Sequence, residues 1–358
     1  MYQFKFYANI KIMVNKIKLK INRELIRLMQ DIDKTYSLSK ISPLLFNSIK
    51  DFLLRDGKRI RPILFCAGYL GFTKKPALNL YKGALSWELL HGFLLIHDDI
   101  IDKSDIRRGK PSMHQMLNKY LKSHKNLKFN GQDLAIVIGD IIYAFAINAL
   151  LSIKQKAGRK EQALKKFIES VIYTGSGEFI ELLYGLENLE KIKKEQIYRI
   201  YDYKTAQYTF ASPLATGAIL AGANKVQIDK LLKYGICLGR AFQIKDDILG
   251  LFSEERKVGK SILSDLQEAK KTMLIWYAYN NSTEENKSTI RMIFTKEKVN
   301  KTDLIKIRKL VTESGALDYA KREITGLLAK AAILIASTAM YPRYKECLNT
   351  YAQEILKL

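Results

Sequence analysis

The sequence is poor in the residues and runs that mark secreted, zinc-binding or membrane-spanning proteins. Its 358 residues include three cysteines, six prolines and four histidines. The cysteines, at positions 66, 237 and 347, lie far apart in apolar surroundings and have no metal-ligand spacing, so they predict buried thiols in a reducing compartment. No apolar run approaches the roughly 20 residues that span a bilayer, and the amino terminus lacks the features of a secretory signal. We therefore expect a soluble, cytoplasmic protein without a transmembrane segment.

The shortage of proline and the lack of low-complexity linkers favour one mainly helical domain. No proline falls between Pro213 and Pro342, which leaves room for long helices, and the 47% of hydrophobic residues suffice for a large core. We expect residues 1–20 to be an extension or a lead-in to the first helix, and residues 21–358 to form the domain. Apolar residues at helical spacing predict helices over residues 21–33, 43–55, 77–104, 133–153, 162–184, 193–221 and 235–252. Residues 271–358 read as further helices and turns that serve as scaffold.

Negative charge is scarce relative to positive charge. Sixty Lys and Arg against 36 Asp and Glu give a net charge of +24, which suits an anionic partner such as nucleic acid, an acidic lipid surface or a phosphorylated small molecule. Much of the excess is lysine scattered over amphipathic segments, as on an ordinary solvated surface. Charge alone therefore does not choose among these partners.

The most informative stretch is LLHGFLLIHDDIIDKSDIRRG, residues 89–109, where an apolar helix ends in carboxylates. Such groups are costly to bury unless cations balance them. On an ideal helix, Asp98 and Asp102 point within about 40° of the direction shared by Trp87, His91 and Leu94. Two carboxylates aimed into one volume repel unless a cation lies between them, and magnesium prefers such oxygen ligands. Taken alone, DDIID fits a solvated helix end equally well.

A second acidic site repeats this layout in residues 235–252. Gln243, Asp246 and Asp247 lie in an apolar helix that is followed by Lys257, Lys260 and, further on, Lys270. Two such helices facing each other would build an acidic cage for several divalent ions, with cations around its rim. The repetition makes a chance origin harder to accept.

Three other polar segments each allow two interpretations. DGKRIRP places Lys58 and Arg61 beside a helix start, which favours anions, but it also fits a basic surface turn. In GSGEFIELL, Glu178 and Glu181 face either the same cavity or solvent. Lys204 and Thr205 precede small residues suited to close helix packing, and we expect Pro213 to kink that helix.

Five motifs in order give the sequence a family resemblance. GKRIRP, HDDIID followed by RRGKPSMH, YKT, FQIKDD and GKSILSDLQEAKKT together resemble the trans-isoprenyl diphosphate synthases, or polyprenyl synthetases, from about Gly57 to Thr272. The resemblance is greatest to archaeal geranylgeranyl diphosphate synthases, because the second acidic motif reads DDILG before a G-K loop. It implies an all-α fold, a single large helical bundle of the isoprenoid synthase type around a central active-site cavity, and a homodimer.

The resemblance also implies a reaction. An allylic diphosphate (dimethylallyl, geranyl or farnesyl) ionises to a carbocation, isopentenyl diphosphate attacks it, and a proton is lost to the departing pyrophosphate. Magnesium and basic side chains would stabilise charge on the leaving group. We expect geranylgeranyl diphosphate as the product and three Mg²⁺ per active site.

The resemblance implies a role for each residue of this sequence that matches a site position of the family. Asp98, Asp102 and Asp246 would be the main metal ligands, with Asp99 and Asp247 in support. The allylic diphosphate would be held by Arg107, Lys204, Lys260 and Lys270. The isopentenyl diphosphate would be held by Lys58, Arg61, His91 and Arg108. Thr205, the Lys204 carbonyl and Gln243 would steady the carbocation, and hydrogen bonding near the site explains His97.

Some positions depart from the family pattern. Gly250 replaces the last aspartate of the second motif, and Glu178 and Glu181 stand where many members have glutamine and aspartate, so we do not assign these glutamates as ligands.

Product length in this family depends on bulky residues before the first aspartate. Here they are Phe93, Leu90 and Trp87, and Trp87 lies roughly 16 Å below Asp98 on an ideal helix, where it can form a floor. The ideal helix places Phe93 about 140° from Asp98, so a wall at Phe93 needs a neighbouring helix to complete it.

Several alternatives remain for the function. One alternative is a farnesyl or longer-chain diphosphate synthase, and another is a non-catalytic partner subunit of a heteromeric synthase. A nucleic-acid-binding helical protein would use the lysines but not aspartates on apolar helices, so we expect no nucleic-acid partner. A terpene cyclase shares the first acidic motif but lacks GKRIRP.

Overall fold

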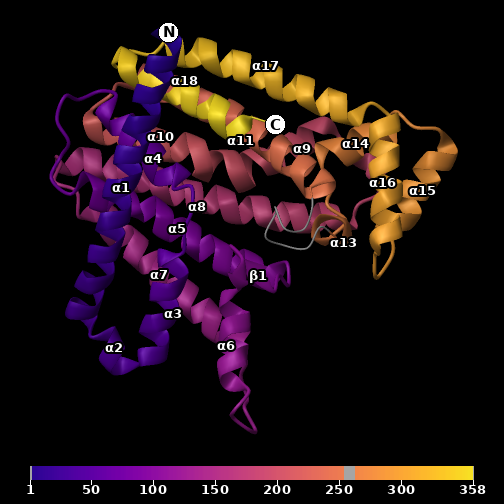
Figure 1. Cartoon of the computed structure of the whole chain (residues 1–358), viewed down its shortest axis with the longest axis horizontal. Coiled ribbons are helices and arrows are strands. Elements are labelled where there is room, and N and C mark those ends of the chain that lie inside the picture. The colour runs from indigo at the N-terminus through magenta and orange to yellow at the C-terminus, as the bar shows by residue number, and fades with distance from the viewer. Residues whose placement is uncertain (1, 254–262, 358) are drawn as a thin grey trace. The chain divides into compact units, whose positions relative to one another are not determined.

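The computed structural model describes residues 2–253 and 263–357, and the chain is almost entirely helical (Figure 1). In these ranges the sheet structure is one antiparallel pair, β1 (Ile106–Arg107) with β2 (Lys110–Pro111). The all-α prediction is confirmed. The chain divides into two compact units: unit 1 is Met1–Lys165 with Thr216–Ala223, and unit 2 is Lys166–Ala215 with Asn224–Leu358.

Unit 1 is built around two long apolar helices, α5 and α7, which pack against each other (Figure 1). α7 begins at an Asn130 capping box, in which Asn130 and Asp133 each satisfy the other's backbone amide. The helices of this unit are α1 (Tyr2–Tyr36), α2 (Leu38–Ile41), α3 (Pro43–Leu54), α4 (Ile60–Leu70), α5 (Leu80–Ile101), α6 (Met113–Leu121), α7 (Gly131–Leu151) and the start of α8 (Ala157–Leu186). α1 packs against α4 and α5.

The interior of unit 1 explains the composition of α7. Ala135, Ile138, Ile142 and Ala146 are buried at helical spacing along it. In the described part of the chain α7 is the helix long and apolar enough to cross a membrane by length and composition, which qualifies our expectation that no run approaches that length. Its buried face matches that of a core helix packed on α5 and α6.

Unit 2 is organised around α11 (Lys225–Phe252), which packs on both η2 (Tyr201–Ala211) and α17 (Ala316–Ala336). η2 is a π-helix, a conformation that is rare at this length. Its backbone lies so close to α11 that a Cβ at Gly235 would collide with Ala211, and one at Gly239 with Ala206. Around them lie α9 (Lys194–Ile200), η1 (Leu189–Lys191), α13 (Ser264–Gln267), α14 (Met273–Asn280), α15 (Glu284–Phe294), α16 (Lys301–Glu313) and α18 (Pro342–Leu356).

Several boundaries differ from the sequence expectations. The first helix begins at Tyr2 rather than near residue 21, so residues 2–20 are helical and continuous with the rest of α1. The helix predicted over 193–221 is divided into α9, η2 and α10 (Ser212–Ala221), and the distortion lies before Pro213, in the π-helical turns. The helical reading of residues 271–357 is confirmed, as are three free, buried cysteines at 66, 237 and 347.

Candidate active site

The first acidic motif lies at the carboxyl end of α5. Asp98 and Asp102, four residues apart, each bring a carboxylate oxygen within 4.8 Å of the other. Both residues are partly exposed, so a hydrated cation can reach them. The donor set, hard oxygens with access to water, suits magnesium.

Asp99, in the same motif, is fully buried, whereas Asp98 and Asp102 are partly exposed. Its Oδ1 accepts a hydrogen bond of 2.7 Å from Nε of Arg107, and the other end of that guanidinium lies 3.3 Å from Asp98 Oδ2. Burial raises the pKa of Asp99 to about 6, against the opposing effect of Arg107. In this structure Asp99 therefore orients the guanidinium of Arg107, and the part of Asp99 in metal binding stays a prediction.

A buried glutamate that we did not single out in the sequence organises the basic cluster. Glu88 on α5 is 4% exposed, and its Oε1 binds the Arg59 guanidinium and lies 3.5 Å from that of Arg108. Arg59 and Arg108 both have positive φ angles, 53° and 56°. Glu88 thus connects the GKRIRP segment, which also carries Lys58 and Arg61, with the RRG turn.

The side chain of Arg55 binds the backbone of the RRG turn. Its Nη1 donates to the carbonyls of Arg107 at 3.3 Å and Pro111 at 3.0 Å, while its Nη2 donates to Asp51 at 2.8 Å. Lys110 also binds Asp51, at 3.0 Å. The two-residue strands β1 and β2 are therefore both anchored to α3, and these contacts fix the backbone position from which the Arg107 and Arg108 side chains extend.

His91 and His97 have different surroundings. Burial, followed by the positive charges of Arg61 and Arg108, lowers the pKa of His91 well below its usual value, so its ring is neutral near pH 7. His97 Nδ1 lies 3.1 Å from the Phe93 carbonyl, and its ring packs where a Cβ on Gly139 would otherwise be. The hydrogen bonding expected of His97 is present.

The residues expected to limit product length lie on α5 at different depths. Trp87 and Leu90 have no exposed surface, whereas Phe93 is partly exposed. The Phe93 ring stacks on Tyr143 of α7, with centroids 5.1 Å apart and planes 29° apart. α7 thus supplies the neighbouring aromatic group that a wall at Phe93 requires.

In unit 2, η2 places its polar residues beside α8 and α11. Lys204 Nζ lies 2.7 Å from Glu178 and 2.5 Å from Glu181, so both glutamates bind this lysine. Thr205 Oγ1 donates to Gln243 Oε1 at 2.7 Å. The structure therefore brings together Thr205 and Gln243, the two side chains grouped in the sequence analysis.

The second acidic motif repeats the contrast seen in the first. Asp246 is exposed, whereas Asp247 is 6% exposed and accepts hydrogen bonds from the Tyr201 hydroxyl and, at 3.1 Å, from Gln243. The Tyr201 hydroxyl in turn accepts from the Met273 amide at 2.9 Å. Burial raises the pKa of Asp247 well above its ordinary value despite these hydrogen bonds.

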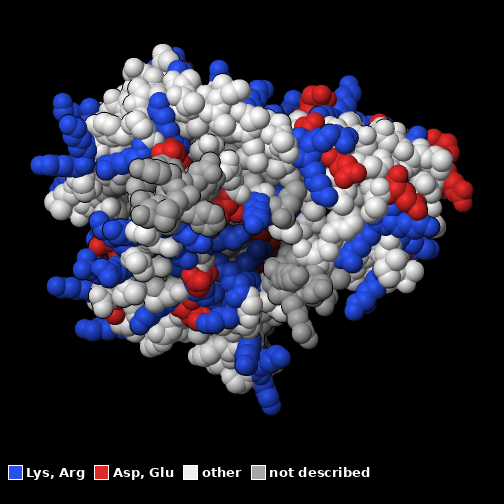
Figure 2. Space-filling view, turned by 45° about the horizontal axis from the view of Figure 1, so that its top comes forward, with Lys and Arg blue, Asp and Glu red and all other residues white. Residues whose placement is uncertain are grey.

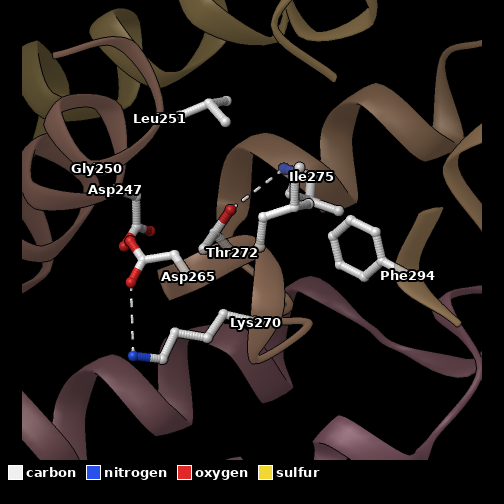
Figure 3. Close-up of a pocket in the computed structure, with 9 residues that line it drawn as sticks. Asp247, Gly250, Leu251, Asp265, Lys270, Thr272, Ile275 and Phe294 are labelled. Carbon is white, nitrogen blue, oxygen red and sulfur yellow. Dashed lines mark hydrogen bonds and ion pairs between the residues drawn. The ribbon is translucent and has the colours of Figure 1, made fainter. Parts of the chain in front are cut away.

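A pocket in unit 2 begins at Asp247 and contains the acidic and basic residues that follow the motif (Figure 3). Lys270 Nζ lies 3.6 Å from Asp265 Oδ1 and 2.7 Å from Glu268. The Asp265 carboxylate occupies the space into which a Cβ on Gly250 would project. Lys257 and Lys260 lie outside the described residues.

Of the residues with these roles, sequence reasoning missed Glu88, Arg55, Tyr143 and Tyr201. Glu88 carried a usable signal, because a single charge in the apolar run LSWELLH demands a partner if it is buried. The others act through contacts between segments far apart in sequence.

Comparison with known proteins gives the family. The polyprenyl synthetase family model matches residues 42–311. A geranylgeranyl diphosphate synthase of Saccharolobus solfataricus is 33% identical over 273 residues, 74% of this chain and 76% of that protein. A geranylfarnesyl diphosphate synthase of Aeropyrum pernix is 31% identical over 317 residues, 84% of this chain and 90% of that protein.

A solved structure agrees with these matches. The crystal structure of geranylgeranyl pyrophosphate synthase from Corynebacterium glutamicum, complexed with isoprenyl diphosphate and magnesium, is 26% identical and superposes with a TM-score of 0.87. The match covers 96% of this chain and 99% of that one. With its acidic motifs, basic cluster and helical fold in place, this chain belongs to the polyprenyl synthetase family.

Proposed function

We propose that this protein is a magnesium-dependent trans-prenyltransferase that joins isopentenyl diphosphate to allylic diphosphates and releases geranylgeranyl diphosphate. The observation that carries the proposal is the pair Asp98 and Asp102, whose carboxylate oxygens lie within 4.8 Å, in the same unit as the Lys58–Arg61 segment and the Arg107–Arg108 turn. Carboxylates that recruit a divalent cation, next to basic residues that bind phosphate, suit a diphosphate leaving group.

The metal ligands in this proposal are Asp98, Asp102 and Asp246, with Asp99 and Asp247 in support and three Mg²⁺ per active site. When bound, magnesium would offset the negative charge that builds on the departing pyrophosphate. The carboxylates of Asp98, which is partly exposed at 25% of its side chain, and of Asp246, which is exposed, suit this role better than the buried ones. Asp99 and Asp247 would act chiefly by holding Arg107 and Tyr201.

The substrate roles divide by position. Arg107, Lys204, Lys260 and Lys270 would bind the allylic diphosphate, and Lys58, Arg61, His91 and Arg108 the isopentenyl diphosphate. A neutral His91 can donate one hydrogen bond without adding a further charge to the arginine-rich cluster. Thr205 and Gln243, joined at 2.7 Å, would present their polar atoms and the Lys204 carbonyl to the carbocation.

The twenty-carbon product is the finer part of the proposal. Phe93 stacked on Tyr143 would form the wall that limits chain growth, with Leu90 and the buried Trp87 beyond it. The relatives include both geranylgeranyl and geranylfarnesyl diphosphate synthases, so a product one isoprene unit longer is the second candidate.

One assay tests both parts. The protein is incubated with isopentenyl diphosphate and labelled dimethylallyl, geranyl or farnesyl diphosphate, and the dephosphorylated products are sized. We expect a twenty-carbon product that requires magnesium, and its loss in Asp98→Ala and Asp102→Ala. Activity that persists after divalent ions are chelated would contradict the metal proposal, and absence of any elongated product would contradict the reaction.

We also propose a cytoplasmic homodimer in which residues 21–358 act as one synthase domain. The exposed stripe of α8 supports the dimer: Ile172, Phe179, Leu182 and Leu186 are 62%, 64%, 52% and 84% exposed. Residues 168–186 contain no Lys or Arg, so this apolar face suits a second copy. The double variant Phe179→Ser with Leu186→Ser should give a monomer by light scattering, whereas Ile333→Ser, 72% exposed on α17, should remain dimeric.

A further inference from the structure

The outward face of α1 combines exposed aliphatic side chains with basic ones. Ile12, Leu19 and Ile26 are 49%, 56% and 52% exposed, and they follow one another at intervals of seven residues. Seven residues are nearly two helical turns, so the three side chains form one stripe about 21 Å long. The opposite face is buried in unit 1 through Val14, Ile17, Ile21 and Leu25.

The charge of this segment is strongly one-sided. Residues 10–27 contain six basic residues and one acidic residue, Glu24: the basic ones are Lys11, Lys16, Lys18, Lys20, Arg23 and Arg27. Glu24 pairs with Arg27 at 2.8 Å, and Lys18 lies 3.6 Å from Asp56. Lys16 and Arg23 are exposed, flank the aliphatic stripe and form no ion pair within the described residues.

We propose that this face docks the enzyme on a bilayer surface rich in anionic phospholipid. A helix lying in the plane of the interface buries aliphatic side chains at the headgroup boundary while Lys and Arg reach the phosphates. Because the inner face of α1 is packed on α4 and α5, the helix can bind lipid without leaving the protein. The surplus of positive charge over the surface has the sign that anionic lipid attracts (Figure 2).

The pattern fits lipid better than a second copy of the chain. A coiled-coil seam would need a second exposed apolar position three or four residues after each stripe residue. After Ile12 and Leu19 these positions hold Asn15, Lys16, Asn22 and Arg23, and after Ile26 they hold Met29, which is buried in the core, and Gln30. Two copies joined here would also bring like charges together. The uncharged stripe of α8 shows the contrast, because it lacks the basic residues that lipid phosphates need.

Duplex nucleic acid shares the anionic phosphates but offers no apolar surface for the aliphatic stripe. The lipid proposal therefore requires Leu19 and Ile26 as well as the basic residues, whereas binding to phosphate alone would require only the latter. This difference separates the two in experiment.

The test is flotation of the full-length protein with vesicles of phosphatidylcholine, with and without phosphatidylglycerol. We expect binding to the anionic vesicles that weakens with salt. Lys16→Gln with Arg23→Gln should weaken it roughly thirtyfold, about fivefold for each basic residue. Leu19→Ser with Ile26→Ser should weaken it about tenfold or more. The matched controls are Lys321→Gln with Arg322→Gln on α17 and Ile305→Ser with Ile333→Ser, all at exposed positions, and they should bind as the unaltered protein does.

The prenyl-transfer rate without vesicles should be unchanged in both α1 variants, so the membrane-docking proposal is tested independently of the proposed reaction. Equal binding to neutral and anionic vesicles would overturn it, as would absence of binding to either. Binding that the control pairs weaken as much as the α1 pairs would overturn it too. Salt-sensitive binding to duplex DNA that ignores the Leu19 and Ile26 changes would assign the face to phosphate alone.

Discussion

Arg107 donates a hydrogen bond of 2.7 Å from Nε to Oδ1 of Asp99, a carboxylate with no exposed surface at the centre of the first acidic motif. The buried aspartate of HDDIID thus binds Arg107 most closely, while Asp98, 3.3 Å from the same guanidinium, and Asp102 are partly exposed. The same division recurs in unit 2, where Asp247 is buried against Tyr201 and Asp246 is exposed. Each motif therefore pairs an outward carboxylate with a buried one that fixes its surroundings.

Asp99→Asn tests this division in the first motif. The substitution keeps the shape of the side chain but removes the charged acceptor 2.7 Å from Arg107 and leaves that guanidinium with Asp98 at 3.3 Å, which should lower the free energy of unfolding by about 2 kcal/mol. Because the Arg107 guanidinium would no longer be held in one orientation, the KM for the allylic diphosphate should rise about tenfold. The KM for isopentenyl diphosphate should change less. Chemical denaturation and steady-state kinetics measure the two effects. Asp105→Asn, at an exposed position bound to Gln115, is the control and should resemble the unaltered protein.

Glu88→Gln should show the opposite kinetic pattern. Glu88 holds Arg59 and Arg108, so losing its charge should raise the KM for isopentenyl diphosphate about tenfold while the KM for the allylic substrate changes less. The two variants serve as controls for each other, because a general loss of folded protein would lower the apparent kcat and leave both KM values unchanged. If Asp99→Asn and Glu88→Gln change the same KM, the assignment of the two clusters to different substrates is wrong.

Local chemistry explains which parts of the site the sequence predicts. The apolar run before Asp98 has helical spacing, and carboxylates four residues apart on a helix must be neighbours, so α5 and the Asp98–Asp102 pair follow from residue order alone. The fold class follows similarly, since proline is rare and apolar residues recur at helical intervals.

The remainder depends on contacts that no local pattern encodes. Arg55 anchors carbonyls more than fifty residues away, and Tyr143 reaches Phe93 from another helix. The π-helix of η2 arises where α11 presents Gly235 and Gly239 to it, so the distortion expected at Pro213 lies before that residue instead. Burial of Asp99 and Asp247 likewise becomes visible only once the helices are packed.

Product length should respond to both partners of the Phe93–Tyr143 stack. Phe93→Ser or Tyr143→Ala removes one ring of the wall, so we expect longer prenyl diphosphates from either variant. We expect the same from Trp87→Ala, which removes the floor proposed below Phe93. Trp87→Ala should also lower the free energy of unfolding by about 3–5 kcal/mol, because Trp87 is fully buried. Chromatographic sizing of the products provides the measurement. Phe129→Ser, the same change at a position 45% exposed, should leave the distribution unaltered, and an unchanged distribution in Phe93→Ser and Tyr143→Ala together would rule out this wall.

His91 should make folding stability depend on pH in a defined direction. Burial and the neighbouring Arg61 and Arg108 lower its pKa in the folded state well below the usual 6.5, so below pH 6.5 the unfolded chain binds a proton that the folded chain does not. Stability therefore rises with pH across this window, and His91 should contribute about 1.4 kcal/mol per pH unit to the slope below 6.5.

Denaturation curves between pH 5 and pH 7 for the unaltered protein and His91→Gln should diverge by that amount, because all other titrating groups are common to both. His124→Gln, with its ring at the surface, is the matched control and should parallel the unaltered protein. Parallel curves for His91→Gln would mean that His91 accepts a proton in the folded state as readily as in the unfolded chain, and the neutral imidazole proposed at the isopentenyl diphosphate site would then be wrong.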